Sequence, residues 1–149
     1  MTRQGDKGAS KPAQTHGDMA LRVMTMPRDA NVYGTIFGGV ILGYIDQAAF
    51  IEARKLGAHR WVTAAMDKVE FKAPVHLGDV VNLRTRPVRM GTSSVTVEVE
   101  VDAERLVPSS DGPAGVIVPV THATLVMVAV DKAGKPIPYD SPSTVGPAS

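Results

Sequence analysis

The chain has 149 residues, a formal net charge of +1 and no cysteine, and 44% of its residues are hydrophobic. A chain of this length most naturally folds as one domain with a real core, and its near-zero charge gives no reason to expect nucleic acid as a partner. The lack of cysteine excludes disulfides, thiolate nucleophiles and thiolate metal sites, and fits a cytoplasmic protein.

The predicted elements are one strand, one long helix and four further strands. Residues 1–17 are polar, lack the apolar segment of a signal peptide, and are expected to be a disordered tail. Residues 19–26 predict the first strand, and residues 38–56 predict a helix that stops at Gly57. Four strands are predicted at 61–71, 80–89, 95–101 and 120–130, the last apolar enough to be central in its sheet. Residues 139–149 are expected to form a flexible tail, which leaves a domain of residues 18–138.

One helix followed by consecutive antiparallel strands is typical of an α+β fold with the helix on one face of a sheet. The predicted helix is apolar on nearly every face, and a sheet covers only one side of it. We therefore expect a strongly curved sheet, and an edge strand that pairs with a second copy to form a dimer. Charged side chains at Asp46, Glu52, Arg54 and Lys55 argue against a membrane span.

A single carboxylate, Asp46, lies in the middle of this apolar helix. From Ile36 to Ile51, only Asp46 and Gln47 are clearly polar. A carboxylate in such surroundings needs a partner or a function. Asp46 is therefore either a structural carboxylate bonded to backbone or basic groups, or a general base or nucleophile at a cleft between protomers.

Two glycines, Gly38 and Gly39, precede Asp46 at the predicted start of the helix. They either permit the turn into the helix or let a ligand approach the free N–H groups, where the helix dipole favours developing negative charge. Asp46 lies about 10 Å further along the axis, so a partner subunit would supply the second element of a shared site. Asn31, in the preceding turn, is either a local turn residue or an amide that orients water or a carbonyl oxygen.

Arginines on one predicted strand lead into a turn that is rich in hydroxyl groups. They form either a solvated face or, with free N–H groups in the turn, a seat for a phosphorylated ligand. The residues are Arg84, Arg86 and Arg89, followed by Gly91, Thr92, Ser93 and Ser94. The histidines show no metal-ligand spacing, and there is no nucleophile elbow, phosphate-binding loop or dinucleotide fingerprint, so we expect neither a metal nor a cofactor.

The segment from Asn31 to Gly39, followed by Ile45 and Asp46, resembles the signature of the hotdog-fold acyl-CoA thioesterases, in the broad-specificity acyl-CoA hydrolase branch. The similarity covers roughly residues 19–138 and keeps the order of the family's motifs. Further matching motifs lie at 62–63, 71–75, 78–80, 91–94 and 128–136.

The resemblance implies a hotdog fold, in which a five-stranded antiparallel sheet wraps around one long central helix. It implies hydrolysis of fatty acyl-CoA to free acid and coenzyme A, which enters only as part of substrate and product. The implied assembly is a homodimer with shared active sites, often a trimer of dimers. From the net charge of +1 we expect neither nucleic acid nor a membrane as a partner.

The resemblance also implies roles for individual residues. Asp46 would be the catalytic carboxylate, and Asn31 would belong to the same site but come from the other half of the dimer. Helix-start amides near Gly38 and Gly39 would polarise the thioester carbonyl. The nucleotide end of coenzyme A would lie along the turn formed by Gly91, Thr92, Ser93 and Ser94, together with Arg89.

Two other readings keep the hotdog fold. An acyl-thioester hydratase or dehydratase would carry a histidine in the catalytic motif, and none occurs from 17 to 58. A non-catalytic acyl-CoA-binding regulator would carry a DNA-binding helical segment, for which the residues before the first strand are expected to be too few. Thiol release from acyl-CoA separates a hydrolase from such a sensor.

Overall fold

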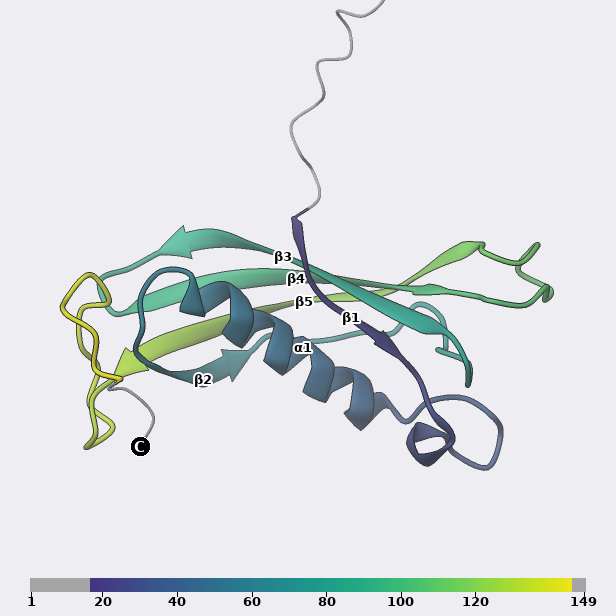
Figure 1. Ribbon diagram of the computed structural model, residues 1–149, viewed down its shortest axis with the longest axis horizontal. Coiled ribbons are helices and arrows are strands. Elements are labelled where there is room, and N and C mark those ends of the chain that lie inside the picture. The colour runs from purple at the N-terminus through teal and green to yellow at the C-terminus, as the bar shows by residue number, and fades with distance from the viewer. Residues whose placement is uncertain (1–16, 146–149) are drawn as a thin grey trace, which may run out of the picture.

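Five antiparallel strands form one sheet that curls around a single long helix (Figure 1). The coordinates are a computed structural model that describes residues 17–145, so residues 1–16 of the predicted N-terminal tail lie outside it. The sheet order is β1-β3-β4-β5-β2, which leaves β1 and β2 at the edges. This is the α+β hotdog arrangement that the resemblance implied. The elements are β1 (Asp18–Met24), the short 3-10 helix η2 (Pro27–Asp29), α1 (Gly38–Arg54), β2 (Arg60–Met66), β3 (Val80–Met90), β4 (Ser94–Glu104) and β5 (Ile117–Val130).

The helix α1 begins at Gly38, as predicted, and divides into two faces. Its buried face packs against the valine-rich inner face of the sheet, and three of its core residues are alanines, which let the helix lie close to the strands. The opposite face is exposed in the single chain and includes Gly39, Gly43, Asp46, Gln47 and Phe50. The sheet thus covers only one side of the helix. Within residues 17–145, no helix is long and apolar enough to cross a membrane.

The strand β2 is shorter than predicted, because it ends at Met66 instead of continuing to residue 71. Its pairing with β5 contains an irregularity between Thr63 and Ala65. Beyond Met66 the bonds to β5 become sparse: the Asp67 N–H donates to the Thr124 carbonyl at 2.9 Å and the Lys72 N–H to the Val120 carbonyl at 2.7 Å. The Lys68 N–H between them bonds to the Asp67 side chain at 2.9 Å. The chain from 67 to 79 instead forms a connection that reaches the start of α1, where the Ile36 N–H donates to the Val75 carbonyl at 2.8 Å.

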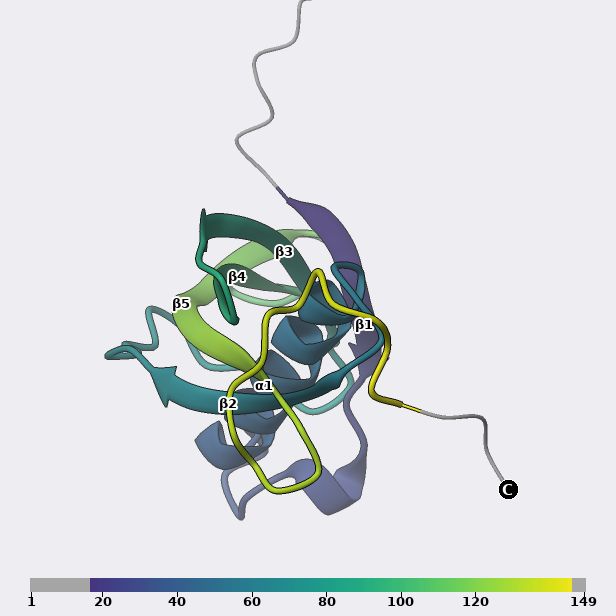
Figure 2. The same cartoon turned by 90° about the vertical axis from the view of Figure 1, so that its left-hand side faces the viewer.

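The C-terminal segment that follows the predicted domain end at residue 138 makes hydrogen bonds to the rest of the fold as far as the structure describes it, and residues 146–149 of the predicted tail lie outside the described part. The Tyr139 N–H donates to the Thr92 carbonyl at 3.1 Å, and the Thr144 N–H donates to the Ala58 carbonyl at 3.2 Å. His59 binds the segment twice, through Nε2 to the Tyr139 carbonyl at 2.8 Å and through Nδ1 to the Thr144 hydroxyl at 3.1 Å. Figure 2 shows this segment in yellow at the end of the molecule where α1 leads into β2. The described chain is therefore bound to the rest of the fold as far as Thr144.

Candidate active site

Asp46 lies on the open face of α1, directed towards β2. The Thr63 hydroxyl of β2 donates a hydrogen bond to the Asp46 carboxylate. Thr63 Oγ1 also lies 3.4 Å from Met127 Sδ, on the neighbouring strand β5. Within residues 17–145, no other hydrogen-bond or ion-pair partner of the Asp46 side chain is found. One carboxylate oxygen is therefore held by the sheet, while the other can meet water or a substrate.

The Asp46–Thr63 pair lies beside a pocket of about 610 Å³ between the second half of α1 and the start of β2. Five of its lining side chains are apolar, and Asp46 supplies its only charge. Such a lining suits an apolar ligand whose reacting group lies at the carboxylate. The lining residues are Asp46, Gln47, Phe50, Ile51, Trp61, Val62, Thr63 and Met127.

The start of α1 lies at a different pocket, of about 340 Å³. Gly38 lines it, together with Phe71 and the 72–75 connection. A side chain at Gly38 would meet the Phe71 ring at 3.6 Å, whereas one at Gly39 would meet nothing within 4 Å. Helix geometry leaves the first N–H groups of α1 without partners inside the helix, so a ligand can approach them. In a single chain, this helix start and Asp46 therefore line separate pockets.

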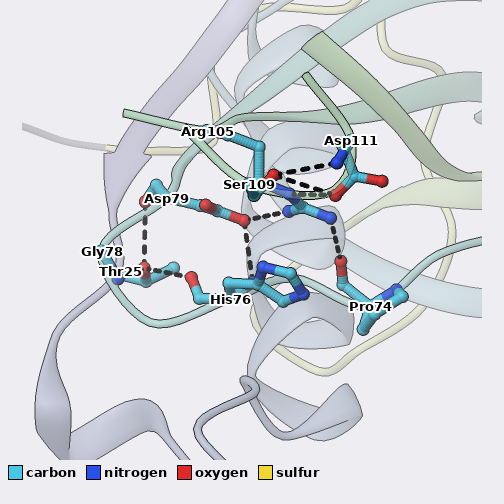
Figure 3. A network of polar contacts seen from close by, with 8 residues as sticks. All are labelled: Thr25, Pro74, His76, Gly78, Asp79, Arg105, Ser109 and Asp111. Atoms are coloured by element: carbon cyan, nitrogen blue, oxygen red, sulfur yellow. Dashed lines mark hydrogen bonds and ion pairs between the residues drawn. The ribbon is translucent and has the colours of Figure 1, made fainter. Parts of the chain in front are cut away.

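A buried ion pair ties the connection between β2 and β3 to Arg105, the residue that follows β4 (Figure 3). The Arg105 guanidinium binds the Asp79 carboxylate, and the two side chains are only 3% and 4% exposed. Arg105 also donates to the Pro74 carbonyl at 3.1 Å and to Asp111 at 3.0 Å. Asp79 in turn accepts from the His76 N–H at 2.7 Å. Arg105 thereby fixes one wall of the pocket at Gly38, a role that no local sequence pattern indicated.

Asn31 uses its side chain within its own loop. Its amide oxygen accepts from the Tyr33 N–H at 2.8 Å and from the Thr35 N–H at 3.2 Å, and its amide nitrogen donates to the Thr35 hydroxyl at 2.8 Å. This is the local turn role that Asn commonly has. The second N–H of the amide remains available for a ligand, so a role in a shared site stays a prediction.

The predicted coenzyme A turn connects β3 to β4 at the C-terminal end of α1 (Figure 1). The Gly91 N–H donates to the Ser94 carbonyl at 2.8 Å, so it is not free for a phosphate as the sequence suggested. The carbonyls of Thr92 and Ser93 accept bonds from the C-terminal segment and from β5. Arg89 is exposed beside the turn. The residues that line the pocket at Asp46 do not include this turn.

Two other arginines from the same predicted set form ion pairs on the outer face of the sheet. Arg84 lies 2.7 Å from Asp102, and Arg86 lies 2.6 Å from Glu98, across the β3–β4 pairing. These contacts fit the solvated face that was the alternative reading. Within residues 17–145, no group of three or more His, Asp or Glu side chains could hold a metal ion.

Sequence reasoning did not identify Thr63 and Trp61 as site residues. Thr63 belongs to the short 62–63 motif, which was the only available signal for it. Its contact with Asp46 joins residues 17 positions apart and exists only because β2 folds back beside α1. Trp61 carried no signal, because a single tryptophan at the start of a strand is most often a core residue.

A five-stranded antiparallel sheet that curls around one long helix is the hotdog fold. Residues 33–107 match the family model described as the thioesterase superfamily. The chain belongs to the thioesterase superfamily.

Named relatives are similar over most of the chain. The acyl-CoA thioester hydrolase YciA of Salmonella typhimurium is 36% identical over 122 residues, which cover 82% of this chain and 90% of the relative. A hexameric hotdog fold thioesterase of Campylobacter jejuni is 43% identical with a TM-score of 0.74, over 83% of this chain and 90% of that one. A hexameric broad specificity acyl-coenzyme A thioesterase, solved as an aspartate-to-alanine mutant, is 35% identical with a TM-score of 0.75. The match covers 83% of this chain and 86% of that one.

Proposed function

We propose that the protein hydrolyses fatty acyl-CoA thioesters to the free acid and coenzyme A, with Asp46 as the catalytic carboxylate. The observation that carries this proposal is the Asp46 carboxylate, oriented by Thr63 beside a mostly apolar pocket. The names of the relatives, acyl-CoA thioester hydrolase and broad specificity acyl-coenzyme A thioesterase, support the class of substrate.

The reaction needs one carboxylate oxygen and a polarised carbonyl. As a general base, Asp46 takes a proton from water while the water oxygen bonds to the thioester carbon; the C–S bond then breaks and coenzyme A leaves as the thiolate. As a nucleophile, Asp46 first displaces the thiolate to form a mixed anhydride, which water then cleaves. A thiolate leaves readily because thiols are far stronger acids than alcohols; the cysteine thiol, for example, has a pKa of about 8.5. Neither route therefore requires a triad.

The second half of the site comes, in this proposal, from a second copy of the chain. The N–H groups near Gly38 and Gly39 polarise the carbonyl, and Asn31 orients it. Gly39 is about 10 Å along the helix from the Asp46 of the same chain, whereas two helices from different protomers can bring the groups together. The hexameric assembly named for the solved neighbours supports a trimer of dimers.

Two surfaces are suited to this dimer. The edge strand β2 is uncharged from Val62 to Ala65 and exposed along that length, so its unpaired backbone groups are open to a second strand. The tip of the Asn31 loop presents Val32 and Tyr33 with 91% and 86% of their surface exposed. Two neighbouring exposed apolar side chains at a loop tip are suited to contact with another protein.

We expect Ala64→Arg to weaken the dimer and lower thiol release to the same extent. The substitution places a charge on the exposed edge of β2, where it opposes strand pairing. Sedimentation at micromolar concentration measures the assembly, and the matched control is Ala133→Arg in the exposed turn after β5. A monomeric Ala64→Arg protein with full activity would contradict the shared site.

The nucleotide end of coenzyme A lies, in the same proposal, along the Gly91–Ser94 turn. The exposed Arg89 guanidinium beside that turn offers paired donors to phosphate.

The test of the function is thiol release from a series of acyl-CoAs of increasing chain length, followed with a thiol reagent. A hydrolase releases coenzyme A from at least part of the series. Binding of acyl-CoA without thiol release from any member would instead identify a non-catalytic regulator.

We expect Thr63→Val to lower kcat by about 10- to 100-fold, because a small misplacement of a catalytic group has that cost. The hydroxyl that orients Asp46 is lost, while the shape of the side chain is kept. KM should change little, and Thr63→Ser should recover most of the activity. Steady-state kinetics checks both; an unchanged kcat in Thr63→Val would show that the bond is only structural.

A further inference from the structure

The groove between α1 and β2 is closed at one end by the chain itself. Residues 55–59 join the end of α1 directly to the start of β2, so the space between helix and strand ends at this connection. The Asp46–Thr63 pair lies away from the connection, and Trp61 lies next to it. The Trp61 indole N–H donates to the Gly57 carbonyl of the connection at 3.0 Å. Trp61 is therefore the last side chain of the groove.

The indole is fixed from behind by two other rings. The Tyr139 ring lies 5.8 Å from it, and the His59 ring meets it edge-on at 6.3 Å. The backbone carbonyl of Tyr139 accepts a hydrogen bond from His59 Nε2 at 2.8 Å, which fixes the position of this residue. The space at Gly57, whose carbonyl accepts the bond from the indole, is also filled: a Cβ there would lie 2.7 Å from the Tyr139 carbonyl oxygen. Trp61 is 5% exposed and cannot swing away without moving the docked C-terminal segment.

We propose that Trp61, braced by Tyr139, forms the end wall of the acyl pocket and sets the longest acyl chain that the enzyme accepts. The inference rests on the proposed function. A thioester carbonyl at Asp46 directs its acyl chain along Phe50 and Ile51 towards the indole, because these apolar side chains follow Asp46 by about one helical turn. The C-terminal segment, which touches no substrate, positions the wall.

A second direction for the acyl chain is available at the start of α1. That pocket contains the Phe71 ring but also Lys72, and its volume is about 340 Å³ against about 610 Å³ for the pocket at Asp46. The larger pocket is also the one that contains the Asp46 carboxylate, together with five apolar side chains. These features favour the groove that ends at Trp61.

The test compares kcat/KM across saturated acyl-CoAs of increasing length. Each methylene buried in an apolar site raises kcat/KM about fourfold, so the wild-type value should rise with length and stop rising where the chain reaches Trp61. In Trp61→Ala the rise should continue, and two further methylenes should raise kcat/KM for those chains about 15-fold. Trp61→Phe, which keeps a smaller ring in the core, should give an intermediate shift.

Variants of Tyr139, which packs against Trp61, test whether the position of the indole sets the chain-length profile or whether any destabilising change alters it. Tyr139→Ala should shift the profile towards longer chains in the same way, while Tyr139→Phe, which keeps the ring, should restore the wild-type profile. Val107→Ala, which removes apolar surface on the β4–β5 connection, should leave the profile unchanged.

Two results would overturn the inference while leaving the proposed function intact. One is an unchanged profile, or an equal loss at every length, in both Trp61 variants of an active enzyme. The other is a shift towards longer chains in Phe71→Ala but not in Trp61→Phe. If the wild-type protein hydrolyses no acyl-CoA of any length, the proposed function itself fails, and the inference fails with it.

Discussion

Asp46→Ala is expected to lower thiol release from acyl-CoA by about a thousandfold or more, the scale of loss when a catalytic base or nucleophile is removed. Neither water activation nor attack on the carbonyl is possible without the carboxylate. Because Asp46 is exposed in the chain and the substitution removes one hydrogen bond, from Thr63, the free energy of unfolding should fall by only about 1 kcal/mol. Single-turnover kinetics and denaturant unfolding measure the two quantities.

Asp46→Asn provides the sharper version of this experiment. The amide keeps the size of the side chain and an oxygen that can accept the Thr63 hydrogen bond, but it cannot act as a base. We expect the same loss as in Asp46→Ala. The control is Glu70→Gln, which removes an exposed carboxylate that pairs with the exposed Lys68 and should keep full activity. Wild-type kcat in Asp46→Asn would remove Asp46 from the mechanism.

Arg105→Ala is expected to lower the free energy of unfolding by about 3–5 kcal/mol, the cost of leaving one partner of a buried ion pair alone. The variant leaves the Asp79 carboxylate buried without its cation and the Pro74 carbonyl without its donor. Denaturant unfolding at a fixed protein concentration measures the loss, since oligomer stability depends on concentration.

Two comparisons identify the cause of that loss. Arg84→Ala breaks an ion pair at the outer face, where the side chains are 28% and 20% exposed, and should cost about 1 kcal/mol or less. The double variant Arg105→Met with Asp79→Leu should recover part of the stability, because no charge is then buried. A loss below about 1 kcal/mol in Arg105→Ala would show that the pair is not needed to hold the connection.

The elements that followed from periodicity were predicted well. The alternation of valine with polar residues along 95–101 corresponds to the alternating burial of β4, and the apolar run at 120–130 corresponds to β5 in the interior of the sheet. The helix start at Gly38 was also correct. These features are local: the order of apolar and polar residues along the chain directly shows the side-chain period of a strand or a helix.

The errors occurred where distant residues decide the outcome. The end of β2 at Met66 depends on its pairing with β5, and the docking of Tyr139 depends on His59 and Thr92. Glu52 also appeared in the sequence only as a charge in the helix, yet it is buried and accepts a hydrogen bond from Thr85 at 2.8 Å. No window of neighbouring residues contains such partners.

The sequence by itself determined the fold class, the family resemblance and the choice of Asp46 as the carboxylate to test. Those conclusions depend on residue type and spacing along one helix and its flanking motifs. Only the tertiary structure decided that Thr63 orients Asp46, that Gly38 lines a different pocket of the same chain, and that Trp61 closes the groove. The physical reason is that each of these features depends on how the helix and the strands lie relative to one another. The contacts involved form, and contribute free energy, only after the sheet has curled around the helix.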